Sequence, residues 1–114
     1  MTRGHLQHNQ YMLYKFKSKA TGDLIMLEQH GNQVLRIIGK EPAPKGILLC
    51  NDMPQALNDL QDAIDEQEEL VREREARGES GDNAELVTLR QRAVPFMDML
   101  RRCIHNECDV VWGV

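Results

Sequence analysis

Two apolar stripes with helical spacing, separated by a short polar segment, constrain the fold of this chain most. The first runs from Ala56 to Val71 and the second from Leu86 to Ile104, with apolar residues at steps of three and four. Residues 78–83 between them have the composition of a loop. The pattern predicts two long helices that pair antiparallel and bury one face each.

A shorter helix precedes this pair. Gly31 can open it, and Gly39 stands where a left-handed C-terminal cap is expected. Two prolines in residues 41–45 then predict an extended connector, because proline disfavours the helical conformation of the residue before it. The first long helix has its own start signal, since Asp52 and Gln55 have the spacing of a capping box.

The remaining apolar segments have the length and composition of strands. Residues 12–17 alternate with period two, residues 24–27 are all apolar, and a loop is predicted at 18–23. Residues 46–50 predict a buried strand, and residues 109–114 predict a closing strand that pairs with 12–17. The predicted class is α+β, a small mixed sheet of about four short strands packed with the short helix and the antiparallel helical hairpin.

One domain is expected, because 114 residues are too few to build two cores. Residues 1–11 are polar and predict an N-terminal tail, which leaves residues 12–114 as the domain. No apolar run reaches membrane-spanning length, and residues 1–10 are polar and not basic-then-apolar, so we expect neither a membrane span nor a signal peptide. With an odd number of cysteines, these features predict a cytoplasmic protein with free thiols and no membrane partner.

The net charge of −4 divides unevenly, with +4 in residues 1–50 and −8 in residues 51–114. An acidic balance argues against general binding to nucleic acid. Lys15, Lys17 and Lys19 alternate with Tyr14 and Phe16, as in strands that stack single-stranded bases. Strand alternation favours a different interpretation, in which the two aromatic rings face the core beneath a solvated row of lysines.

Cys103, His105 and Cys108 have the ligand types of a zinc or iron site, although a structural zinc needs a fourth ligand. Cys103 also belongs to the apolar stripe, where a free cysteine acts as a small hydrophobe. We favour that structural interpretation, assign no metal ligands or cofactor, and keep a metal-binding or redox protein as an alternative.

A small-molecule enzyme is the further alternative. It would need a pocket in which polar groups such as Arg90, Arg92 and Tyr14 converge. The arginines can equally pair with Glu66, Glu68 or Glu69 on the neighbouring helix, which we expect, and the carboxylates of residues 59–75 are expected on a solvated arc. No catalytic residue can be assigned, and the chain has no phosphate-binding loop or nucleophile elbow.

Five ordered stretches resemble one family: MLYKFKSKA, GDLIML, IIGKEPAPKGIL, LRQRAVPFMDMLRR and DVVWGV. The family is the bacterial domain of unknown function number 1840, found mainly in β-proteobacteria. The resemblance covers residues 12–114 and implies no activity, cofactor or catalytic residue. We therefore expect a non-enzymatic binding or protein-interaction module, and exposed strand edges predict a homodimer or a protein partner.

Overall fold

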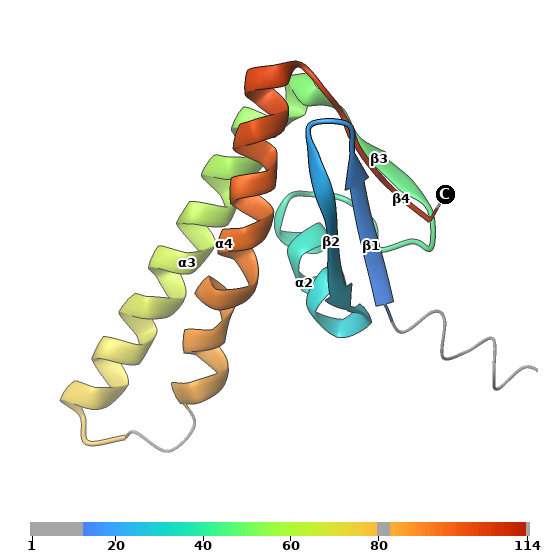
Figure 1. The fold of residues 1–114 in the computed structure, drawn as a ribbon. Helices are drawn as coiled ribbons and strands as arrows, with labels where there is room; N and C mark the ends of the chain where they lie inside the picture. The colour runs from blue at the N-terminus through green and yellow to red at the C-terminus, as the bar shows by residue number, and fades with distance from the viewer. Residues whose placement is uncertain (1–12, 80–82, 114) are drawn as a thin grey trace, which may run out of the picture.

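Four strands form one antiparallel sheet in the computed structural model, which describes residues 13–79 and 83–113 (Figure 1). The strands are β1 (Leu13–Ser18), β2 (Thr21–Leu27), β3 (Gly46–Leu48) and β4 (Val110–Trp112), in the spatial order β2-β1-β4-β3. The α+β class and the pairing of the closing strand with β1 are confirmed. The sheet is not mixed, because each of its three strand pairs runs antiparallel.

The β1–β2 hairpin turns more tightly than the predicted loop over residues 18–23. Only Lys19 and Ala20 lie between the strands. The Ser18 hydroxyl accepts a hydrogen bond from the backbone N–H of Ala20 at 3.1 Å, so a side chain completes this turn. The predicted connection between the two strands is present but shorter, because Ser18 belongs to β1 and β2 begins at Thr21.

The short helix α2 (Glu28–Ile37) begins directly after β2, three residues before the predicted start. Gly31 lies inside the helix and not at its start. A Cβ at this position would overlap with the ring of Tyr14, so only glycine fits here without a shift. The glycine lets α2 approach β1 closely. The predicted cap at Gly39 is confirmed, with φ at +81°.

The long helices α3 (Met53–Ala76) and α4 (Asn83–Asn106) form the predicted hairpin and extend well beyond the sheet (Figure 1). The prediction of a capping box at the start of α3 is wrong. Asp52 belongs to a 3-10 helix, η1 (Cys50–Asp52), and already has helical dihedral angles, so its side chain makes no cap hydrogen bond. Gln55 donates instead to Asp59 at 2.9 Å. Residues 80–82, in the predicted loop, and the predicted tail lie outside the described residues.

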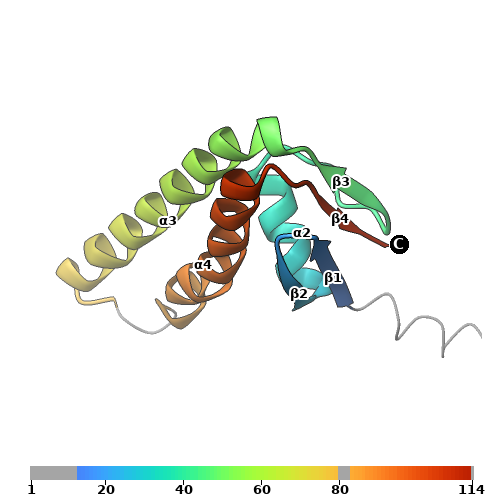
Figure 2. The same cartoon turned by 45° about the horizontal axis from the view of Figure 1, so that its top comes forward.

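Helices α2 and α4 cover one face of the sheet, and α3 packs against both of them (Figure 2). At the centre of this core, the ring of Phe16 contacts Phe96 of α4 and Trp112 of β4 edge to face, with centroids 5.0 and 5.6 Å away. The indole N–H of Trp112 donates to the carbonyl of Ala43, which fixes the connector before β3. Strand β3 is only partly buried, against prediction, because it is an edge strand and Ile47 points away from this core.

Candidate functional site

The structure gives the three residues of the Cys103, His105 and Cys108 cluster different surroundings. Cys103 is fully buried, and its thiol donates to the Ser18 hydroxyl at 3.1 Å. Burial raises the pKa of this thiol, although the hydrogen bond to Ser18 opposes the shift. Cys108 is half-buried and His105 is exposed. Among the described residues, no three metal-ligating side chains lie close enough to hold a metal ion.

A helix-ending motif accounts for the spacing of the two cysteines. Glu107 has a left-handed backbone with φ at +56°. The N–H of Cys108 donates to the carbonyl of Cys103 at 2.9 Å, and the N–H of Glu107 donates to the carbonyl of Ile104 at 3.3 Å. These are the two hydrogen bonds of a Schellman motif, in which the residues five apart are expected to be apolar partners. The cysteine spacing is thus a feature of this helix end.

The polar groups proposed for an enzyme pocket have separate partners. Arg90 forms a two-pronged ion pair with Glu68 of α3, at 2.6 and 3.0 Å, as the helix-pairing interpretation predicts. The hydrogen bond from Arg90 is the main reason that the pKa of Glu68 is lowered. Arg92 reaches Gln33 of α2 at 3.4 Å, and the Tyr14 hydroxyl donates to Asn32. These contacts do not bring the three side chains together in one pocket.

Large apolar side chains remain exposed on the outer face of the sheet, which is the face turned away from α2 and α4. Strands with one solvated face normally place polar side chains there. Here five apolar side chains at or beside the strands are 42–57% exposed: Leu13, Ile25, Leu27, Ile47 and Leu49. Val111 of β4 is half-buried on the same face. Apolar patches of this kind mark interaction sites in soluble proteins.

Strand pairing joins these side chains into one continuous surface. Leu13 of β1 lies opposite Leu27 of β2, and Lys15 lies opposite Ile25. At the other side of β1, Val111 pairs with Lys17 and also with Ile47 of β3. We call this surface the outer face. It is apolar at its borders and carries lysines along its central strand.

The predicted arrangement of β1 is confirmed. Tyr14 and Phe16 are buried in the core, whereas Lys15 is exposed on the outer face. The rings are therefore covered by α2 and α4 and cannot stack on bases. The lysine row is a charged component of the outer face and is separated from the aromatic pair by the strand itself.

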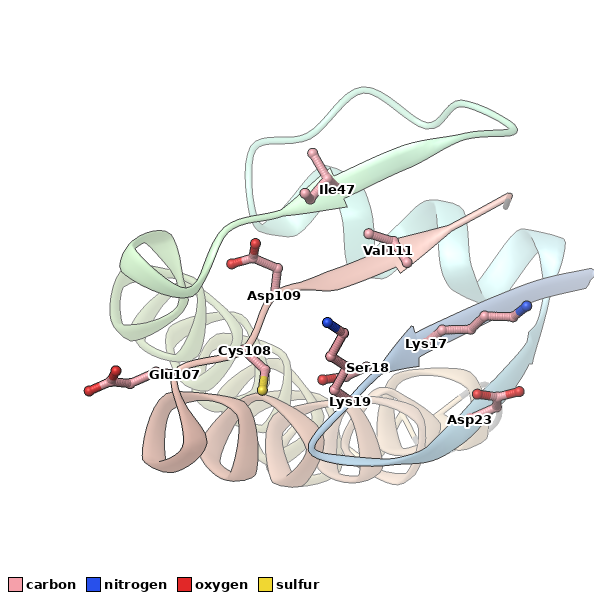
Figure 3. A pocket seen from close by; sticks show the side chains of 9 residues that line it. All are labelled: Lys17, Ser18, Lys19, Asp23, Ile47, Glu107, Cys108, Asp109 and Val111. Atoms are coloured by element: carbon pink, nitrogen blue, oxygen red, sulfur yellow. The ribbon is translucent and has the colours of Figure 1, made fainter.

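A shallow depression of about 560 Å³ lies at one end of the outer face (Figure 3). Its walls combine cationic, anionic and thiol side chains, among them Lys17, Lys19, Asp23, Cys108 and Asp109. Lys19 extends over the space between the ends of β1 and β4, and Glu107 points away from it. Asp109 already accepts the N–H of Cys50 at 2.8 Å, which ties β4 to η1. The depression is thus an extension of the outer face with mixed charge.

Sequence reasoning missed the outer face for a definable reason. Residues 24–27 are all apolar and predict a strand without showing which of its faces is covered. The lysines of β1 indicated which face is exposed. Side chains of the neighbouring strands that pair with these lysines lie on the same solvated face of the sheet. Ile25 pairs with Lys15 and therefore has to lie on the same exposed side.

Fold and surface together define a class of protein, a small α+β domain whose antiparallel sheet has helices on one face and an exposed apolar face on the other. The chain belongs to the family described as Domain of unknown function (DUF1840), whose model matches residues 12–112. No curated protein and no solved structure matched the chain. Within the described residues, none of the helices combines the length and apolar character needed to cross a bilayer.

Proposed function

We propose that this domain is a non-enzymatic protein-interaction module that binds through the outer face of its sheet. The observation that carries the proposal is the set of apolar side chains exposed there, of which Ile25 is the most exposed at 57%. Burying this surface against a partner would be favourable by about 25 cal/mol per Å² of apolar area before the costs of association. The cytoplasm, where the three cysteines would stay reduced, is the proposed location.

The proposal is tested by placing a photo-crosslinking amino acid at position 25 of the full chain in its native host. We expect a discrete protein adduct on illumination. The same amino acid at Glu75, an exposed position of α3, is the matched control and should give no such adduct. If position 25 gave no more adduct than position 75, the outer face would not be a binding surface.

The homodimer expected from the strand edges is a separate part of this proposal. The sheet has two edge strands, β3 with three residues and β2 with seven, so β2 offers more backbone groups to a second copy. Light scattering over a wide concentration range measures the mass directly. A mass that stays at that of one chain at high concentration would remove the homodimer and leave a different protein as the partner.

A further inference from the structure

We infer that the partner of the outer face is an amphipathic helix with acidic side chains beside its apolar stripe. This inference rests on the proposed function, since it assumes that the outer face binds a protein. It follows from three properties of that face: its size, the spacing of its apolar side chains and the sign of its charges.

The outer face is small. Strands β1 and β2 have six and seven residues, whereas β3 and β4 have three each. With about 3.3 Å per residue and about 4.8 Å between strands, the sheet covers about 300 Å². A standard stable interface buries about 800 Å² of accessible surface per partner, so a face of this size suits a small, transient interface. A helix, about 10 Å wide, fits these dimensions.

The apolar side chains match the spacing of a helix. Ile25 and Leu27 are two residues apart on one side of β2 and therefore stand about 7 Å apart. Positions i and i+4 of a helix are about 6 Å apart along its axis. Leu13, which pairs with Leu27, widens this apolar row onto β1. A helix laid along β2 can therefore set two successive apolar side chains against this row.

The charges select an acidic partner. Lys15 is exposed on the outer face opposite Ile25, and Lys19 is exposed at the turn that follows β1. Asp23 is the acidic residue of β2, and Asp109 is engaged by the N–H of Cys50. A second copy placed face to face would bring the lysines of two central strands together, which is unfavourable. Carboxylates beside an apolar stripe would meet these lysines instead.

The test uses the full chain and two synthetic helical peptides as probes. Both peptides carry the same leucine stripe, flanked by glutamates in one and by lysines in the other. Fluorescence anisotropy at low salt gives the two dissociation constants. We expect the glutamate peptide to bind at least tenfold more tightly, and Ile25→Thr to weaken the binding of both peptides.

A pair of charge variants isolates the contribution of the outer face. Lys15→Glu should reduce the preference for the glutamate peptide to less than threefold. Lys40→Glu makes the same change of charge beyond the end of α2, beside Gly39 and away from the outer face, and should leave the preference within twofold of the parent chain. Raising the salt concentration should reduce the preference in the parent chain, because exposed charges are screened.

Several results would overturn the acidic helix as the partner. In the peptide assay, these results are equal binding of both peptides, binding of neither peptide, or an equal effect of the two charge variants. Two other results would do the same. One is self-association of the chain that Ile25→Thr abolishes, and the other is retention on anionic phospholipid vesicles without a preference between the peptides. The crosslink at position 25 is independent of these measurements. A crosslinked adduct with no preference for the glutamate peptide would retain the interaction module and reject only this kind of partner.

Discussion

Glu107→Gly should stabilise the protein, because Glu107 holds a backbone conformation that suits glycine. The ends of α2 and α3 have the same Schellman hydrogen bonds as α4, but glycine takes the left-handed position there, at Gly39 and Gly78. A side chain in this conformation costs roughly 1–2 kcal/mol. Glycine removes that cost but gains more entropy in the unfolded chain, roughly 0.5–1 kcal/mol. The expected net gain is therefore about 0.5–1 kcal/mol.

The gain should appear as a rise in the melting temperature. The entropy of unfolding is about 2.1 cal/mol/K per residue, or about 0.24 kcal/mol/K for a chain of 114 residues. The expected rise is thus about 2–4 °C, measured by circular dichroism and checked by urea unfolding. Glu107→Ala is the control, since it removes the same charge but keeps a Cβ, and it should give no gain. Equal melting temperatures for the two variants would refute the account of this helix end.

Three further outcomes follow from burial and packing. Ile25→Thr should change the free energy of unfolding by less than about 0.5 kcal/mol, because the Ile25 side chain is mostly exposed. Met26, one residue along β2, is 7% exposed, so Met26→Ala should lower the free energy of unfolding by about 2–4 kcal/mol. Urea titration measures both changes. Gly31→Ala should destabilise the protein, because the new Cβ would overlap with the Tyr14 ring. This overlap costs roughly 1–3 kcal/mol and outweighs the gain in helix propensity of about 1 kcal/mol. A raised urea midpoint would contradict this. With a thiol-specific reagent, two of the three cysteines should react in the native protein, and Cys103 only after unfolding, because it is fully buried and its pKa is raised by burial.

The long helices were predictable from sequence because their evidence is redundant. Each of α3 and α4 spans 24 residues, so the apolar period repeats over several turns, and no single residue decides the assignment. The pairing of β4 with β1 was predictable because the segments at the two ends of the domain are both rich in bulky residues that favour strands.

Two of the errors fall where local contacts at the end of an element decide the structure. The β1–β2 turn is closed by the Ser18 hydroxyl, and the start of α3 is set by η1, which leaves Asp52 in a helical conformation. Neither choice is visible in composition. The spacing of Cys103 and Cys108 is equally ambiguous, because a metal site and a Schellman motif both place two such residues five apart.

On the outer face, the residues that folding requires can be distinguished from those that the proposed function requires. If Ile25 contributes little to stability, folding does not explain why an isoleucine stands where a threonine would fold equally well. An exposed apolar strand also carries a risk of aggregation, which charged side chains on the same surface reduce. Lys15, directly opposite Ile25, provides that charge. Under the proposed function, the charge of Lys15 would have two roles: it would disfavour a second copy placed face to face, and it would attract the carboxylates of an acidic helix.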